Sequence, residues 1–222
     1  MASDPPAGGP IAATDTLFHY RSMYDYAGLV NSSKGKTMTF DNIYLLHGKG
    51  GSPEGSAKQL EEVLRREIGV GVSSTLFHRP RLLHSNPDIT TEASLADFQA
   101  KDVPVNSVLI GISLGGLVAA KLQEESRENL HVICINSPTW ADGVRLEKKM
   151  PNRLAFYSSR DEVIAGRTSD WPTLAQAFDL PWLTHDTDAH KLALARLAVT
   201  YLQGGDVAAA VRDSERNQGV GH

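Results

Sequence analysis

A serine between two glycines is the part of the sequence with the clearest chemical meaning. Residues 111–115 read Gly-Ile-Ser-Leu-Gly, and Gly116 follows. The apolar, β-branched run before them is typical of a buried strand, and small and aliphatic residues at helical spacing come after them. A turn this sharp strains the serine and requires small residues two positions away on either side. We therefore predict that Ser113 is a nucleophile at the carboxyl end of a sheet; the alternative is a chance match in a glycine-rich loop.

A serine hydroxyl is a poor nucleophile by itself and needs a base, which in turn needs a carboxylate to orient it. Asp161 comes just after an apolar segment that predicts a strand, and it precedes the histidines of the C-terminal third. The chain order Ser, Asp, His is therefore present. Glu162 is the rival carboxylate, and the alternative role for Asp161 is to cap a turn. The sequence favours Asp161 as the catalytic acid.

Two histidines five residues apart are candidates for the base. His185 is expected within or at the close of the last strand, where an imidazole is usually structural, whereas His190 ends the next loop and opens the final helix. The sequence thus favours His190 as the general base, with His185 as the alternative. The pair also lies close to Asp186 and Asp188, but the spacing fits no closed metal site, so no metal is expected.

Two backbone N–H groups are expected to stabilise the oxyanion of the tetrahedral intermediate. One belongs to Leu114, the residue after the nucleophile, and the other to Lys49 in the glycine-rich loop of residues 47–52. A phosphate-binding loop is the alternative for this segment, but it lacks the required glycine and lysine spacing. His47 is expected to tie the loop in place and not to move protons.

Strand and helix patterns alternate along the chain, which predicts a mostly parallel sheet with helices on both faces. Weak edge-strand signals lie at 17–20 and 37–40. Clearer strands are expected over 42–47, 73–78, 105–112, 131–136, 153–159 and 181–185, and helices over 53–68, 91–101, 114–122, 171–178 and 191–203. Ligands bind such sheets outside the carboxyl ends of the strands, where the candidate residues are expected to lie.

Length and charge describe an ordinary single-domain protein. The chain has 222 residues and a net charge of −4, so neither nucleic acid nor an anionic membrane is an expected partner, and no apolar run is long enough to span a bilayer. We expect a flexible leader over 1–13, one domain over 14–203 and a polar tail over 204–222. The single cysteine, Cys134, falls in a buried strand, and the first residues do not resemble a signal peptide. A reducing, cytoplasmic location is therefore expected.

With these motifs in their order, the sequence resembles a small α/β-hydrolase. The resemblance spans residues 42–203 and rests on Ile43–Gly51, Gly111–Gly115, Asp161 and His190. Within that superfamily, the segments 44–48, 52–53 and 56–58 are similar to the compact bacterial esterases of the YqiA type. The resemblance implies a three-layer α/β-hydrolase fold, and the short region before Ile43 leaves room for fewer strands at the N-terminal edge of its sheet.

The same resemblance implies a serine hydrolase that cleaves small acyl esters through an acyl-enzyme on Ser113, without a cofactor. An acyl thioesterase is the first alternative, and a slow or non-catalytic ligand-binding receptor is the second. Residues 137–151 are too few for the lid that many relatives insert there, so we expect no cap domain and an open cleft. Candidate residues for the acyl pocket are Trp140, Val163 and Trp171, each of which could also be ordinary packing. The sequence leaves the oligomeric state open.

Overall fold

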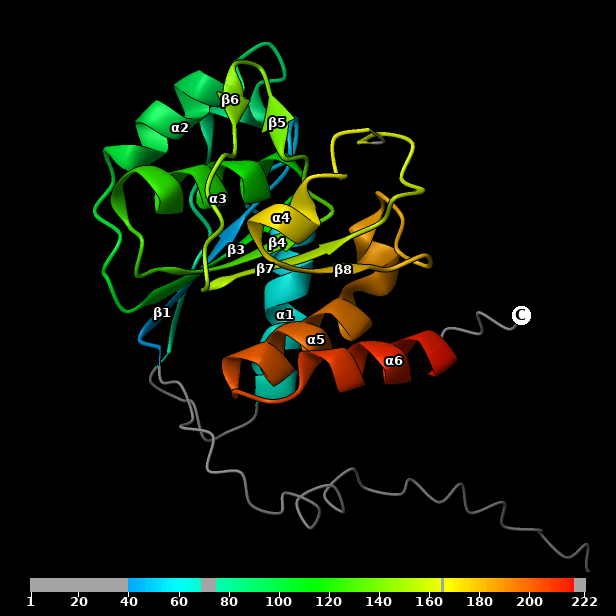
Figure 1. Cartoon of the computed structure of the whole chain (residues 1–222). Helices are drawn as coiled ribbons and strands as arrows, with labels where there is room; N and C mark the ends of the chain where they lie inside the picture. Colours follow the sequence, from blue (N-terminus) through cyan, green and yellow to red (C-terminus); the bar gives the residue numbers. More distant parts are fainter. Residues whose placement is uncertain (1–39, 69–74, 165, 218–222) are drawn as a thin grey trace, which may run out of the picture. The chain divides into compact units, whose positions relative to one another are not determined.

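The computed structural model describes residues 40–68, 75–164 and 166–217 (Figure 1). All of these residues belong to one compact unit of the chain. The expected leader, the edge-strand candidate at 17–20 and all but the last residue of the candidate at 37–40 lie outside the described residues.

Six parallel strands form the central sheet, in the order β2-β1-β3-β4-β7-β8. The strands are β1 (Asn42–Leu46), β2 (Leu76–His78), β3 (Ser107–Ile112), β4 (His131–Ile135), β7 (Arg153–Tyr157) and β8 (Gln176–Asp179). The chain passes from β1 to β2 on one side and then returns to place β3 on the other side of β1. The strand order thus reverses between β1 and β3, and open α/β sheets bind their ligands at such a reversal.

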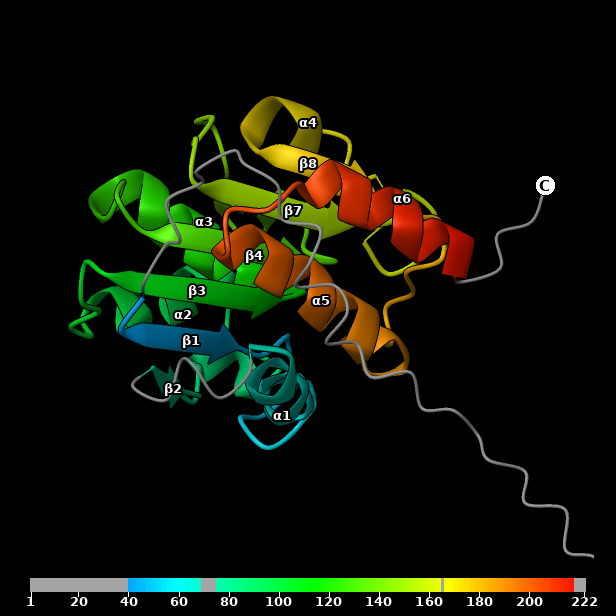
Figure 2. The ribbon, with the colours of Figure 1, turned by 90° about the horizontal axis from the view of Figure 1, so that it is seen from below.

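Helices cover both faces of this sheet, as the alternating patterns predict. The helices are α1 (Ser56–Ile68), α2 (Thr91–Gln99), α3 (Leu114–Ser126), α4 (Trp171–Leu174), α5 (Lys191–Leu202) and α6 (Val207–Asn217), with 3₁₀ turns η3 (Leu83–Ser85) and η4 (Thr187–His190). Figure 1 shows α2 and α3 above the sheet and α1, α5 and α6 below it, and Figure 2 shows these last three helices in front of the strands. The layers are therefore helix, sheet, helix.

Alternation along each strand divides the core in two. In β3, Val108 and Ile110 pack with α1 and α5, whereas Leu109 between them packs with α2 and α3. Side chains of a strand point alternately to opposite faces, so a strand covered on both faces must be apolar throughout. All six residues of β3 are buried, which is why the sequence shows a continuous apolar run there.

The C-terminal elements differ from the expected ones. Residues 176–179 form the last strand, not 181–185, and the expected helix over 171–178 ends at Leu174 because Ala175 takes an extended backbone and the chain then pairs with β7. Pairing with a sheet edge overrides a helical pattern that few residues support. The segment expected to be a polar tail contains α6, whose Val207 and Val211 lie four residues apart on one helical face and are buried in the core.

A two-stranded hairpin lies within residues 137–151, the segment in which no lid was expected. Its strands are β5 (Trp140–Ala141) and β6 (Val144–Arg145), and its turn consists of Asp142 and Gly143, both with positive φ. In the part of the chain that the structure describes, there is no cap domain. Within that same part, no helix has both the length and the apolar character needed to cross a bilayer.

Candidate active site

Ser113 lies at the strand-to-helix turn between β3 and α3, in the strained geometry that the motif predicts. Its φ is 52° and its ψ is −125°, a region that residues other than glycine rarely adopt. A Cβ on Gly111 would overlap the backbone of Gly116, and a Cβ on Gly115 would lie 2.5 Å from the carbonyl oxygens of Leu46 and His47. The elbow is therefore possible only because these positions carry no side chain.

The imidazole of His185 lies between Ser113 and Asp161. Its Nε2 is 3.4 Å from the Oγ of Ser113, and its Nδ1 is 3.0 Å from the Oδ2 of Asp161. A carboxylate only accepts hydrogen bonds, so Nδ1 carries the proton and Nε2 is free to accept one from the serine. A contact of 3.4 Å is long, as is common for a catalytic pair before the transition state forms. The three side chains form a Ser–His–Asp chain of the kind that supports acyl transfer.

His190 does not reach Ser113, so the preference for His190 over His185 is corrected. The Nε2 of His190 is 3.2 Å from the hydroxyl of Thr184, and its ring packs 5.3 Å from that of Trp182. Burial lowers the pKa of His190 below its ordinary value. The error began with the strand boundary: because β8 ends at Asp179, His185 lies on the loop beyond the strand, and that loop carries it to Ser113.

Asp161 is held rigidly beyond the end of β7. Its side chain is 0% exposed. Its Oδ1 accepts hydrogen bonds from the N–H groups of Val163 at 2.8 Å and Ile164 at 3.3 Å, which leaves Oδ2 for His185. These two backbone donors fix the orientation of the carboxylate. Glu162, the rival carboxylate, is exposed.

The loop after β1 packs directly against the serine, as the expected oxyanion site requires. A Cβ on Gly48 would lie 3.0 Å from the Cβ of Ser113 and 3.6 Å from its Oγ. Among the described residues, neither the N–H of Lys49 nor that of Leu114 donates to a protein acceptor. The ammonium of Lys49 pairs with Asp142 at 3.1 Å and lowers the pKa of that carboxyl. Because the ammonium of Lys49 is engaged with Asp142, its main-chain N–H is the group that could donate to an oxyanion.

Two buried imidazoles hold this loop. The Nε2 of His47 accepts the N–H of Leu82 at 3.2 Å, so its Nδ1 carries the proton and donates to the Gly48 carbonyl. His84 donates from Nε2 to the carbonyl of His47 at 2.9 Å, and its own carbonyl accepts the N–H of Gly50 at 2.8 Å. Burial lowers the pKa of both rings, that of His84 to about 4. Both are therefore neutral near pH 7 and act as fixed hydrogen-bonding groups.

The three candidate pocket residues are not alike. Trp171 is fully buried in the core and donates from Nε1 to the carbonyl of Ser137 at 2.8 Å, so it lines no open pocket. Trp140 and Val163 are 42% and 56% exposed. The guanidinium of Arg167 lies over the ring of Trp140 and donates to the carbonyl of Val163. Of the three candidates, Trp140 and Val163 are therefore the ones whose side chains are open to solvent.

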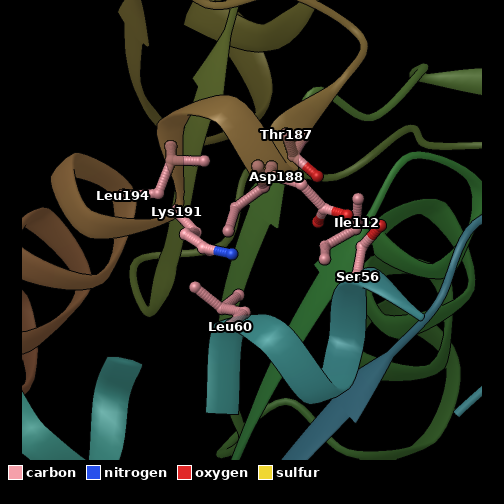
Figure 3. Close-up of a pocket in the computed structure, with 8 residues that line it drawn as sticks. Ser56, Leu60, Ile112, Thr187, Asp188, Lys191 and Leu194 are labelled. Carbon is pink, nitrogen blue, oxygen red and sulfur yellow. The ribbon is translucent and has the colours of Figure 1, made fainter. Parts of the chain in front are cut away.

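A crevice lies on the α1 and α5 face, next to the end of β3 (Figure 3). It includes Ile112, the residue before the nucleophile. Gln59 joins two of its polar side chains, since it donates to Asp188 and accepts from Lys191. The side chains that line it leave no space for a water-sized molecule between them, so it is a surface crevice and not a formed binding cavity. The lining residues are Ser56, Leu60, Ile112, Ile135, Thr187, Asp188, Lys191 and Leu194.

Sequence reasoning missed two further residues at the site, His84 and Asn136. Nothing in the polar segment around His84 marks it, because its role arises only when η3 folds against the loop after β1. Asn136 directly follows β4, and so it has the strand-end position that drew attention to Asp161. In the described segments, no group of three or more His, Cys, Asp or Glu residues is arranged to hold a metal ion.

Comparison with solved structures identifies the fold. Over 73% of this chain and 97% of the other, it is similar to a protein of the alpha/beta hydrolase superfamily from Xanthomonas campestris pv. campestris, with 20% identity and a TM-score of 0.52. The alpha/beta hydrolase domain-containing protein 10 from mouse matches over 77% of this chain and 91% of its own, with 14% identity and a TM-score of 0.54. A carboxylesterase from Mesorhizobium loti matches over 72% of this chain and 88% of its own, with 16% identity and a TM-score of 0.51.

No protein-family model matches the sequence, and no sequence of a curated protein does. At these identities the structural matches establish the fold alone. The chain has the α/β-hydrolase fold, with a mostly parallel six-stranded sheet and flanking helices, and that expectation is confirmed. The narrower resemblance to YqiA-type esterases stays a prediction.

Proposed function

We propose that this protein, with its α/β-hydrolase fold, is a serine hydrolase that cleaves small acyl esters. The observation that carries the proposal is the line of contacts from Ser113 through His185 to Asp161, at 3.4 Å and 3.0 Å. It begins at a strained elbow and ends at a buried carboxylate. Such an arrangement activates the serine hydroxyl, because the imidazole can accept its proton while the buried carboxylate orients the imidazole.

In the proposed mechanism, the Oγ of Ser113 attacks the acyl carbonyl while Nε2 of His185 takes its proton. Asp161 stabilises the imidazolium, and the N–H groups of Leu114 and Lys49 stabilise the oxyanion. The imidazolium then protonates the leaving alkoxide, which departs as the alcohol. Water, activated by the same imidazole, releases the acid from the acyl-enzyme. Removing one oxyanion donor of this kind typically slows turnover by about 10²- to 10³-fold.

We infer the size of the substrate from the short connection between β4 and β7. The short β5–β6 hairpin is the insertion between β4 and β7, and in an open cleft of this kind we expect small soluble esters to react without activation at an interface. Trp140 and Val163 are proposed to contact the acyl or alcohol group. The single, buried Cys134 supports a reducing, cytoplasmic location.

A panel of p-nitrophenyl esters of increasing acyl length tests the proposal, together with a fluorophosphonate probe that labels activated serines. We expect turnover that is highest for short acyl chains, and labelling of the native protein that is lost in Ser113→Ala. A native protein that is not labelled, or a Ser113→Ala variant labelled equally well, would overturn it.

Adding acyl thioesters to this panel separates the alternative functions. Acyl thioesters, followed with a thiol reagent, would be cleaved much faster than the matched oxygen esters by a thioesterase. A receptor would turn over neither substrate class, and it would be stabilised against heat by the ligand that it binds.

A further inference from the structure

Asn136 is a buried asparagine at the end of β4, beside the proposed acid and base. Its side chain is 0% exposed and its φ is +45°. Asparagine tolerates this left-handed backbone better than most residues, but the conformation still costs free energy. Strain of this kind persists where the surrounding structure requires it, and it often accompanies functional sites.

The carboxamide of Asn136 bonds three residues in two other chain segments. Its Nδ2 donates to Oδ2 of Asp161 at 2.5 Å and to the carbonyl of Thr184 at 2.8 Å, and its Oδ1 accepts the N–H of Ser158 at 3.1 Å. The orientation of the amide is not ambiguous, because a backbone N–H only donates and a carbonyl only accepts. One side chain therefore connects the end of β4, the end of β7 and the residue before His185.

The oxygen of Asp161 that receives this hydrogen bond is the one that faces His185. Oδ2 accepts both the Nδ2–H of Asn136 and the Nδ1–H of His185. The second N–H of Asn136 holds the peptide just before His185. The carboxylate and the imidazole are thus positioned against the same rigid amide.

Each loop also has its own anchors, independent of Asn136. The N–H of Leu183 donates to Leu180, and that of Leu180 donates to Tyr157 in β7. The N–H of Asp161 donates to the carbonyl of Ser158. Removing the amide should therefore leave both loops folded and change only how they lie relative to each other.

We infer that Asn136 is a positioning residue of the site: it sets the spacing of Asp161 and His185 so that the imidazole stays within reach of Ser113. This inference rests on the proposed serine hydrolase. It assigns Asn136 no contact with the substrate, so its loss should lower kcat and leave KM nearly unchanged.

Asn136→Gly tests the inference, because glycine keeps the left-handed backbone and removes only the amide. We expect kcat per titrated active site to fall about 10- to 100-fold, with KM changed less than about 3-fold, as for the loss of hydrogen bonds to a charged group. The rate of inactivation by the fluorophosphonate should fall in parallel. Asn136→Asp serves as a second variant, since it keeps the shape but places a second acceptor against Asp161.

Gln123→Met is the matched control. Gln123 is also a fully buried amide, which donates to the carbonyl of Leu130 and accepts from Arg153, away from the site. This variant should lower the melting temperature and leave kcat per active site unchanged. If Asn136→Gly behaves in the same way, Asn136 is only structural and the inference is overturned.

A proton NMR signal provides a readout that does not depend on turnover. The low-field resonance of the His185 Nδ1–H, identified by its loss in His185→Ala, should shift or broaden in Asn136→Gly and stay in place in Gln123→Met. If the native protein hydrolyses nothing but this signal responds, the positioning role stands and the proposed function fails. A signal that is unchanged in Asn136→Gly would overturn the positioning role whatever the activity.

Discussion

On one side of Ser113, the elbow of residues 111–116 and the loop of residues 47–51 meet through backbone contacts that only glycine allows. On the other side, the loops of residues 158–164 and 183–190 are joined by the hydrogen bond between His185 and Asp161 and by the side chain of Asn136, which donates to Asp161 and to the carbonyl of Thr184. We call these the elbow side and the acid–base side. Steric contacts require one residue type at each position, whereas a hydrogen bond leaves a choice of partner. The elbow side can therefore be recognised in the sequence from a short motif, and the acid–base side cannot.

The sharpest test of the acid–base side compares its two histidines. His185→Ala should lower kcat by about 10⁴-fold or more on a short-chain p-nitrophenyl ester, because the serine loses its proton acceptor. His190→Ala should change kcat less than about 3-fold, because its ring contacts Thr184 and Trp182 instead. The opposite result would show that the loop rearranges to bring His190 to Ser113, and that His190 is the general base.

The elbow side can be tested with two glycines that differ in the space around them. Gly111→Ala places a Cβ into the backbone of Gly116, so we expect a loss of about 3 kcal/mol or more in the free energy of unfolding, or no folded protein. Gly50 has a φ of +69° and open space around it. Gly50→Ala should cost only about 1–2 kcal/mol of backbone strain.

Urea unfolding of both variants measures the difference. Equal stabilities would mean that the elbow can adjust its backbone, and the steric account of this side would be wrong.

The pH dependence of stability should depend on the imidazoles of the elbow side. Burial lowers the pKa of His84 from 6.5 to about 4, and it lowers that of His47 as well. The unfolded chain thus binds these protons at higher pH than the folded chain does. The contribution of His84 is complete above pH 6.5 and is lost as the pH falls towards 4, a difference of about 3 kcal/mol, and His47 contributes in the same direction.

Unfolding by urea at pH 7.5 and at pH 4.5 provides the measurement. The native protein should lose more stability between these two values than His84→Gln, which has no imidazole to protonate at this position. Equal losses in the two proteins would show that His84 is not the group responsible.

Much of the fold could be predicted from the sequence, because burial on both faces produces continuous apolar strands and amphipathic helices. The sheet, both helical layers and the positions of β1, β3 and β4 follow from such segments. The prediction failed at residues 171–190, where the strands and helices are short and their periodicity is weak. It also failed for α6, whose apolar face shows only two buried valines and whose second half, residues 212–217, is polar.

The sequence alone determined the elbow, since a strained turn between a strand and a helix accepts small residues only, and those residues are contiguous. It also placed Asp161 beyond a strand and supplied two histidines in the right part of the chain. Only the tertiary structure decided between those histidines, because the choice depends on where β8 ends and on which ring the following loop carries to Ser113. The same holds for Asn136 and His84. The side chain of Asn136 bonds residues that lie between 22 and 48 positions away along the chain, and His84 bonds residues that lie 34 and 37 positions away.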